Sequence, residues 1–371
     1  MKIVFAINHP AQYHLFKNAQ RILSSKGNDV VYVIKDKDIL EKLLIAEKQN
    51  YVKLTQKRVG KGKVKIILNG LIDLVIQNFY LFKYCIKARP SVMIGTDYCI
   101  THVGKVLNIP SFVFNEDDYA INKFFCKLAY PLAEVIISPA VCDVGKYKNK
   151  KIGYNGYQKL SYLHPNVFIP DRTVLAKYSG FNSPFVIIRL VSFVAGHDIE
   201  KAHSGITADI LTKIINKLES YNKEVFISSE AELPEALSKY KMKIAPQDIH
   251  HIMAFADLFI ADSQSMIVES AMLGTPSIRF NSFVGHISVL NELEEHYKLT
   301  YGIPVCEPEK LMFKIDELLK ISTFKEEFLA RQKKMLNDKI DVTAFIVWFI
   351  EKYPESRSIM LNKPDYQYNF K

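Results

Sequence analysis

The chain has 371 residues, a net charge of +10 at neutral pH and a hydrophobic fraction of 49%, with only 15 glycines and 15 prolines. This composition excludes a disordered or collagen-like chain, and the length is sufficient for two domains of ordinary size. The five cysteines are widely separated and form no C-x-x-C pair, which argues against a zinc knuckle or a disulfide framework and fits a reducing compartment.

The first elements are short apolar runs alternating with amphipathic segments. The run at 2–7 ends at Asn8, too early for a signal peptide, so it predicts a buried strand and a cytoplasmic protein. An amphipathic helix over 15–27 ends at Gly27. Further strands are predicted at 29–35, 91–96, 111–115 and 134–139.

The long apolar segment 68–90 predicts a core helix. It contains Asp73 and Lys83, with Gln77 and Asn78 between them, so it does not resemble a transmembrane span. Strands that alternate with helices in this way indicate a parallel sheet, whose ligands bind at the carboxyl ends of the strands.

The amino-terminal half is strongly basic. Residues 1–170 hold 25 Lys and Arg against 12 Asp and Glu. The densest run predicts a mobile loop with two glycines and five basic residues: Lys57, Arg58, Lys61, Lys63 and Lys65. The loop is either merely solvated or attracted to an anionic membrane surface. We expect no nucleic-acid partner, because the run lacks interleaved aromatic residues and no nucleic-acid-binding module is present.

A similar α/β pattern restarts after residue 171. Strands are predicted at 185–191, 224–228, 258–261 and 277–280, and helices at 207–220, 249–256 and 265–273. We therefore expect domains at 1–168 and 169–338. The remaining 339–371 contains an apolar helix that needs a partner and is expected to pack back on the first domain.

A polar turn lies between the apolar strand 258–261 and the helix 265–273. Gly274 and Pro276 close that helix. The helix start offers free backbone N–H groups and a positive dipole end, which favour phosphate. Ser263 or Ser265 would cap the helix, and Glu269, four residues after Ser265, either accepts two ribose hydroxyls or is simply solvated.

Four motifs carry a family resemblance: "HPAQYHLFKN", "KLAYPLAEVIISP", "RLVSFVAGHD" and "SMIVESAMLGTPSI". They resemble a family of unknown function that is grouped with GT-B glycosyltransferases and the related non-hydrolysing UDP-N-acetylglucosamine 2-epimerases. The resemblance implies two Rossmann-like α/β domains facing a central cleft. In many GT-B enzymes the polar turn is Gly-Gly-Thr; here Ser265 stands at the Thr, while Ser263 and Gln264 replace the glycines.

The resemblance also implies a donor-nucleotide site in the second domain. The expected donor-binding residues are Arg189, His197, Asp198, Ser263, Gln264, Ser265, Met266 and Glu269. Arg189 lies within an apolar strand, where it needs either a donor phosphate or an internal carboxylate. We interpret His203, His250 and His251 as structural or surface residues.

Candidate catalytic residues in the first domain are His14, Glu116 and Asp117. His14 is expected to open a helix near the first strand, where it acts as a base or makes a capping contact. Burial and repulsion among Glu116, Asp117 and Asp118 would raise one pKa into the range of a base. The resemblance implies that strand-end acids of this kind move protons, as in the epimerases; they would equally deprotonate an acceptor hydroxyl or bind only water. For Asp97 we expect a helix-capping role.

These observations predict a glycosyltransferase that uses a nucleotide-sugar donor, with a UDP-sugar favoured, and a cell-surface polysaccharide or lipid-linked saccharide acceptor. A UDP-sugar 2-epimerase and a non-catalytic nucleotide-sugar binding protein are the alternatives. No metal and no cofactor are expected, because the spacing of His, Cys and Asp suggests no zinc site and no Asp-x-Asp clamp is present. The protein would be cytoplasmic, either free or peripheral on the inner face of the membrane.

Overall fold

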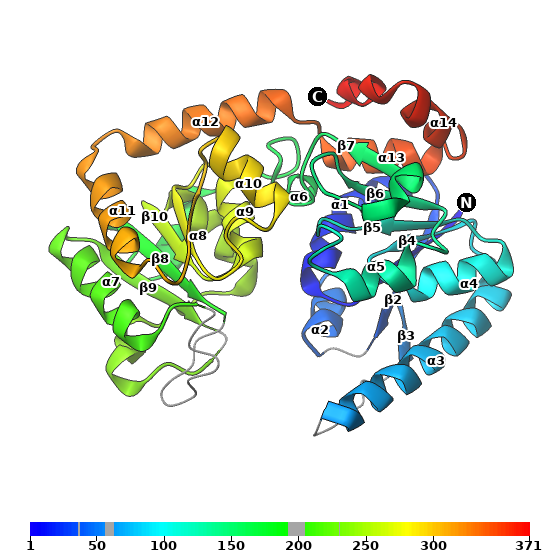
Figure 1. Ribbon diagram of the computed structural model, residues 1–371, viewed down its shortest axis with the longest axis horizontal. Helices are drawn as coiled ribbons and strands as arrows, with labels where there is room; N and C mark the ends of the chain where they lie inside the picture. Colours follow the sequence, from blue (N-terminus) through cyan, green and yellow to red (C-terminus); the bar gives the residue numbers. More distant parts are fainter. Residues whose placement is uncertain (36–37, 56–62, 192–204, 230) are drawn as a thin grey trace. The chain divides into compact units, whose positions relative to one another are not determined.

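The computed structural model describes residues 1–35, 38–55, 63–191, 205–229 and 231–371. The chain forms two compact units (Figure 1). Unit 1 comprises Met1–Tyr162 and Ile340–Lys371, and unit 2 comprises Leu163–Lys339. Six residues singled out above lie outside the described ranges: Lys57, Arg58, Lys61, His197, Asp198 and His203.

Unit 1 is built on a parallel sheet of seven strands in the order β3-β2-β1-β4-β5-β6-β7. The strands are β1 (Lys2–Ile7), β2 (Asp29–Lys35), β3 (Tyr51–Thr55), β4 (Val92–Gly95), β5 (Ser111–Phe114), β6 (Val135–Pro139) and β7 (Lys151–Tyr154). The central strands are apolar and buried almost throughout, as expected for a parallel sheet covered on both faces.

Helices cover both faces of this sheet. The unit contains α1 (Pro10–Ser25), α2 (Asp38–Ala46), α3 (Lys63–Ala88), α4 (Cys99–Leu107), α5 (Lys123–Ala129), α6 (Leu160–Leu163), α13 (Val342–Glu351) and α14 (Glu355–Asn362). Buried side chains of α3, α4 and α5 form one core with Val4, Met93 and Ile136 of the sheet. On the opposite face, Phe16 of α1 packs on Phe5, and α13 packs on α1.

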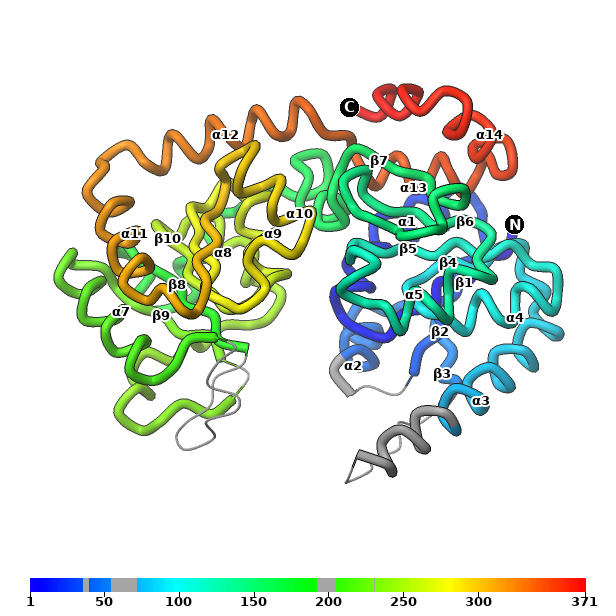
Figure 2. The backbone as a smooth tube through the Cα atoms, in the orientation of Figure 1, coloured from blue at the N-terminus to red at the C-terminus, as the bar shows by residue number. Residues whose placement is uncertain are grey.

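The carboxyl-terminal segment therefore completes the core of unit 1, although it follows the whole of unit 2 in the sequence (Figure 2). Phe349 of α13 lies edge-on to Phe112 of β5, with ring centroids 5.5 Å apart. Trp348 stacks on Tyr366 and packs against Phe370 of the final 3₁₀ turn, Pro364–Phe370. The apolar side chains of α13 are thus buried by residues on both sides of it.

Unit 2 contains a parallel sheet of five strands in the order β12-β11-β10-β8-β9. The strands are β8 (Phe185–Leu190), β9 (Glu224–Ser229), β10 (Leu258–Ala261), β11 (Ser277–Phe280) and β12 (Tyr301–Ile303). The helices are α7 (Ala208–Ser220), α8 (Ile249–Phe255), α9 (Gln264–Met272), α10 (Ser288–Asn291), α11 (Pro308–Lys320) and α12 (Phe324–Asp338). A short π-helical turn, Glu292–His296, follows α10.

The fold corrects one expectation about the basic run. Helix α3 already begins at Lys63, so Lys63 and Lys65 belong to its first turn and not to a loop. Helix α3 confirms the helix that was predicted for the apolar segment 68–90. Among the residues that the structure describes, none of the helices has both the length and the apolar character required to cross a bilayer.

Candidate functional site

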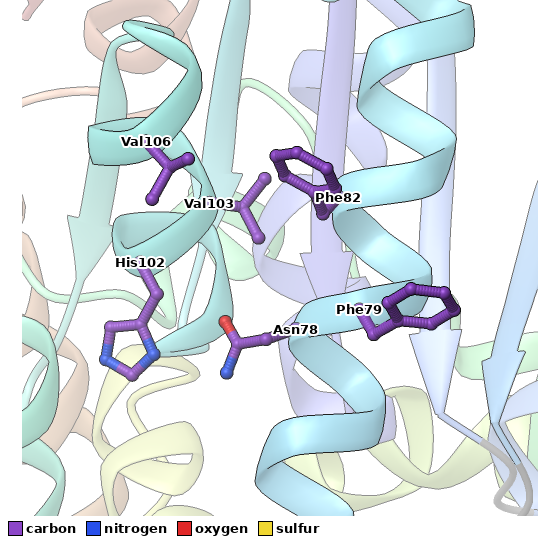
Figure 3. Close-up of a pocket in the computed structure, with 6 residues that line it drawn as sticks. All are labelled: Asn78, Phe79, Phe82, His102, Val103 and Val106. Carbon is purple, nitrogen blue, oxygen red and sulfur yellow. The ribbon is translucent and has the colours of Figure 1, made fainter.

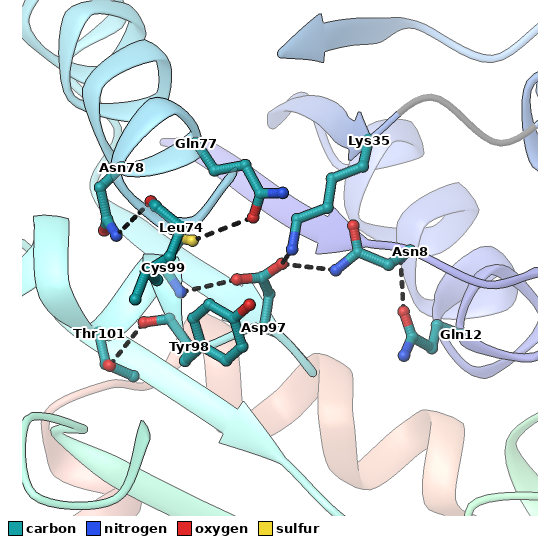
Figure 4. A network of polar contacts seen from close by, with 10 residues as sticks. All are labelled: Asn8, Gln12, Lys35, Leu74, Gln77, Asn78, Asp97, Tyr98, Cys99 and Thr101. Carbon is teal, nitrogen blue, oxygen red and sulfur yellow. Dashed lines mark hydrogen bonds and ion pairs between the residues drawn. The ribbon is translucent and has the colours of Figure 1, made fainter. Parts of the chain in front are cut away.

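Polar side chains meet at the point where the strand order of unit 1 reverses, between β1 and β4. Ligands of open α/β sheets bind at such a switch point, outside the carboxyl ends of the strands. Asn8 follows β1, Lys35 ends β2, and Asp97 follows β4 (Figure 4). Asp97 Oδ2 lies 2.9 Å from Lys35 Nζ and accepts a hydrogen bond from the Asn8 amide, and Asp97 Oδ1 accepts one from the Cys99 N–H at 2.6 Å.

This network fixes the charge of Asp97. Burial raises the pKa of the carboxyl, but the Lys35 ammonium and the three hydrogen bonds together lower it by a larger amount, so the pKa lies below its ordinary value. Burial lowers the pKa of Lys35, but Asp97, with additional contributions from Cys99 and Tyr98, raises it by more, so the pKa of Lys35 lies above its ordinary value. Tyr98 stands at the N-cap position of α4, but Asp97 accepts a hydrogen bond from the N–H of Cys99, the first residue of the helix, as expected for a capping side chain. The ion pair with Lys35, which the sequence did not reveal, keeps Asp97 charged at neutral pH.

The three acids after β5 have different environments. Glu116 is held by Lys159 Nζ at 2.7 Å and by the Gln158 N–H at 2.7 Å, and Asp118 accepts from the Asp143 N–H. Asp117 is the acid whose pKa is raised, first by burial and then by its acidic neighbours, against a weak hydrogen bond from Asn122. The upward direction of the Asp117 pKa agrees with the prediction that one of these acids is shifted toward the range of a base.

Helix α1 is opened by His9, a residue for which no role was predicted. His9, not His14, caps helix α1, because its Nδ1 accepts a hydrogen bond from the Ala11 N–H at 3.2 Å. His14 is the fifth residue of the helix, so the expectation that it opens the helix is wrong. The centroid of its ring lies 5.5 Å from the ring centroid of Tyr162 and 5.8 Å from that of Tyr13.

In unit 2 the polar turn has the predicted strand–turn–helix geometry. It follows β10 at the switch point between β10 and β8. Ser263 is the residue that caps α9, and its hydroxyl accepts a hydrogen bond from the Met266 N–H. Ser265 is exposed in the first turn and does not cap the helix, while Gln264 and Met266 are half-buried.

Asp262, which the sequence analysis did not select, joins the two strand ends. Its carboxylate accepts a hydrogen bond from the Val191 N–H at 2.7 Å, and its backbone carbonyl accepts one from Asn281. The end of β8 and the start of α9 are thereby held together. The only local signal was an acid directly after a predicted buried strand.

Glu269 is buried and has a protein partner. His250 Nε2 of α8 lies 3.2 Å from Glu269 Oε2, and both side chains are less than 15% exposed. His250 is therefore part of this region and not a surface residue, and Glu269 is not simply solvated. The His250 ring also lies edge-on to Phe168. A ligand hydroxyl that used Glu269 would enter a place where the carboxylate is already oriented by the imidazole.

Arg189 is not the buried arginine that the sequence predicted. Arg189 is only half-buried, and its Nη1 donates a hydrogen bond to Ser228 Oγ of β9 at 2.9 Å. The fully buried arginine is Arg279 of β11, which pairs with Glu294 at 2.7 Å. The rule that a buried arginine needs an anion therefore applies to Arg279, which the sequence analysis did not select.

The described residues of unit 2 offer two groups suited to an anionic ligand, the capped start of α9 and the Arg189 guanidinium near the end of β8. The buried carboxylate of Glu269 would repel an anion and is suited to accept hydrogen bonds from hydroxyl groups instead. A helix start stabilises phosphate through its N–H groups and its dipole. Within the described ranges, no three His, Cys, Asp or Glu side chains converge in a way that could hold a metal ion.

Solved structures with the same fold cover nearly the whole chain. MnaA from S. aureus in complex with UDP is 11% identical, with a TM-score of 0.66 over 96% of this chain and 97% of its own. The UDP-GlcNAc 2-epimerase from Neisseria meningitidis, bound to UDP-GlcNAc, is 13% identical, with a TM-score of 0.63 over 95% and 100%. The glycotransferase of kitacinnamycin is also 13% identical, with a TM-score of 0.63 over 95% and 98%.

At such low identity these likenesses show the fold: two Rossmann-like α/β units of the GT-B type, shared by glycosyltransferases and UDP-GlcNAc 2-epimerases. No curated protein matches the sequence. The family model described as "Protein of unknown function (DUF354)" matches residues 1–283, which is more than half of the chain and includes both switch points. The chain therefore belongs to the DUF354 family.

Proposed function

We propose that this protein is a glycosyltransferase that moves a sugar from a nucleotide-sugar donor, preferably a UDP-sugar, to a saccharide acceptor. The acceptor would be a cell-surface polysaccharide or a lipid-linked saccharide. The observation that carries the proposal is the capped start of α9 at the switch point of unit 2, with Glu269 buried one turn further along the helix. The presence of UDP or UDP-GlcNAc in two structures of the same fold supports a uridine nucleotide.

Donor binding is assigned to unit 2. The diphosphate would accept hydrogen bonds from the backbone N–H groups at Gln264 and Ser265, and Arg189 would neutralise part of its charge. Glu269 would accept the ribose hydroxyls. Because the helix start and Arg189 both stabilise negative charge on the leaving diphosphate, the reaction needs no metal ion, and we expect none.

Acceptor activation is assigned to unit 1. Asp117 is the best candidate base, because its raised pKa makes it a stronger proton acceptor than an ordinary aspartate. It would take the proton of the acceptor hydroxyl as the oxygen attacks the anomeric carbon and the C–O bond to the nucleotide diphosphate breaks. His14 is the second candidate. Glu116 has a weaker case, since Lys159 already holds its carboxylate.

A UDP-sugar 2-epimerase is the second candidate function, and the acids after β4 and β5 are the observation that favours it. An epimerase must remove the proton at C2 and return one to the opposite face of the sugar. Asp97 and Asp117 would be the groups involved. The lowered pKa of Asp97 and its ion pair with Lys35 favour the transferase, which needs only one base.

Incubation of the protein with a panel of UDP-sugars in heavy water distinguishes these functions by NMR. A transferase slowly releases UDP from its own donor with water as acceptor, and leaves the C2–H bond intact. Deuterium at C2 would instead identify an epimerase. Saturable binding with neither signal would exclude the epimerase and leave a nucleotide-sugar binding protein or a transferase that lacks its acceptor.

The donor assignment is tested separately with Glu269→Gln, which keeps the size of the buried side chain. We expect UDP affinity to fall by about 1.5 to 3 kcal/mol, the range for hydrogen bonds to a charged group. Asp257→Asn is the matched control, because Asp257 is equally buried and ion-paired but precedes β10, at the opposite end of the strand. Calorimetric titration that gives equal affinities for both variants would refute the ribose assignment.

A further inference from the structure

Helix α3 buries one side against the sheet and leaves apolar side chains on the other. Val75, Phe79 and Ile86 are 67%, 60% and 53% exposed. Their spacing of four and seven residues places them on one side of the helix. On the neighbouring helix α4, Val106 is 72% exposed. The sequence prediction of a core helix is therefore correct for only one side of α3.

A shallow apolar groove of about 280 Å³ lies between α3 and α4 (Figure 3). The groove is lined by Asn78, Phe79, Phe82, His102, Val103 and Val106. Phe82, Val103 and Val106 lie along the space between the helices, and Asn78 and His102 lie at one end of it. The imidazole of His102 contacts the carbonyl of Leu128, which connects this end of the groove to α5.

The groove lies in a strongly basic layer of helices. Helices α3, α4 and α5 together contain seven lysines and a single acidic residue, Asp73. Five of these lysines are exposed: Lys83, Lys87, Lys105, Lys123 and Lys127. On α5, Phe124 is 70% exposed and lies next to Lys123 in the sequence. All three helices thus carry exposed apolar side chains together with exposed lysines.

We infer that this outer surface of α3, α4 and α5 binds an anionic lipid bilayer. The exposed apolar side chains enter the interface between head groups and acyl chains, and the lysines extend their ammonium groups toward lipid phosphates. A second copy of the chain is a poorer occupant, because it would place the lysines of one copy against those of the other. A bilayer surface offers both the apolar region and the negative charge that this face requires.

This inference is independent of the donor site, because lipid binding and nucleotide binding are measured separately. It also differs from an attraction of the 57–65 run alone. An interaction of lysines with anionic lipid is screened by salt, whereas inserted aromatic side chains add binding that salt does not remove. Binding that has both a salt-sensitive part and a salt-insensitive part is therefore the result to be measured.

Flotation of the full chain with vesicles of phosphatidylcholine, with and without phosphatidylglycerol, provides the test. We expect binding to the anionic vesicles, weaker binding to the neutral ones, and partial release by salt. Phe79→Ser with Val106→Ser should lower the partition coefficient by about tenfold or more. Lys83→Gln with Lys87→Gln should lower it by up to about fivefold for each lysine.

Matched controls come from unit 2. Phe313 and Leu329 are 66% and 51% exposed on α11 and α12, so Phe313→Ser with Leu329→Ser removes comparable apolar surface. Lys333→Gln with Lys334→Gln removes the same charge from exposed positions of α12. The inference is supported if the control variants bind vesicles like the original chain while the groove and lysine variants bind more weakly. All variants must also keep the thermal unfolding midpoint of the original chain.

Three results would overturn it. The first is an absence of binding to anionic vesicles, and the second is an equal loss in the control variants. The third is a concentration-dependent dimer in sedimentation velocity that Phe79→Ser with Val106→Ser disperses, since a second copy would then be the occupant of this surface.

Discussion

Replacement of Asp97 by asparagine tests whether the polar network at the switch point of unit 1 stabilises the fold. The carboxylate accepts hydrogen bonds from three donors: Lys35, Asn8 and the Cys99 N–H. The amide of an asparagine can still accept from Cys99, but its NH₂ group then faces the other two donors. The substitution therefore preserves volume and removes the buried ion pair.

The expected cost follows from the burial of the pair. Asp97 is 5% exposed, and loss of one partner of a buried ion pair costs about 3–5 kcal/mol. The Lys35 side chain is 21% exposed and can turn toward water, so we expect a smaller loss of about 2–3 kcal/mol in the free energy of unfolding. For a unit of about 190 residues this corresponds to a fall of roughly 4–12 °C in the unfolding midpoint.

The effect should depend on pH with a defined sign. Because the folded-state pKa of Asp97 is lowered, its stabilisation is fully present above the unfolded pKa of about 3.9 and is lost as the pH falls through the folded value. The difference between the original chain and Asp97→Asn should therefore be constant from about pH 5 to 7. It should narrow below about pH 4.

The chain contains a natural reporter for this measurement. Its single tryptophan, Trp348, is packed within unit 1, so tryptophan fluorescence follows the unfolding of that unit. Asp29→Asn is the control, because Asp29 forms an exposed pair with Lys2 that is worth no more than about 1 kcal/mol. If Asp97→Asn costs no more than Asp29→Asn, or if its cost is the same at pH 7 and pH 3, the proposed role of the network is refuted.

Two further variants test single positions. Gly274→Ala should destabilise unit 2 by about 1–3 kcal/mol, measured by urea denaturation followed by circular dichroism, because Gly274 has φ +71° and an added Cβ would lie 3.0 Å from Leu329 and Gln332. The control is Gly27→Ala, which has φ +84° and open space around it, so it should cost only the backbone strain. Equal losses in the free energy of unfolding for the two variants would contradict the crowding argument. Because the folded-state pKa of Asp117 is raised, the original chain should lose stability as the pH rises from about 4 through that pKa, and Asp117→Asn should remove this decline. If Asp117 is the base, the variant should also lose sugar transfer. Full activity of the folded variant would exclude that role.

Local patterns in the sequence were sufficient for the main elements of the fold. The apolar runs identified the central strands of both sheets, because these strands are buried on both faces and read as continuous hydrophobic segments. The strand, cap and closing glycine around α9 were also predicted correctly, since each depends on neighbouring residues only. Edge strands such as β3, β7 and β12 were missed, because they are short and their apolar pattern is weak.

The candidate site was only partly predictable. The acids after β5 and Glu269 could be found from the sequence, because polar residues follow predicted buried strands or share a face with a helix start. Their partners could not be found in this way. Lys35, Lys159 and His250 reach Asp97, Glu116 and Glu269, respectively, through contacts between segments far apart in the chain.

Tertiary structure therefore decided which charges are neutralised and which residues remain exposed. Arg189 and Arg279 both lie next to last in apolar strands, yet only Arg279 is fully buried, with Glu294 packed beside it, while Arg189 is half-buried and donates to Ser228. The strand order likewise brings β2, β1 and β4 together, so Lys35 meets Asp97. Periodicity and caps are local properties that a sequence displays directly, whereas burial and pairing depend on which distant segments the sheet places side by side.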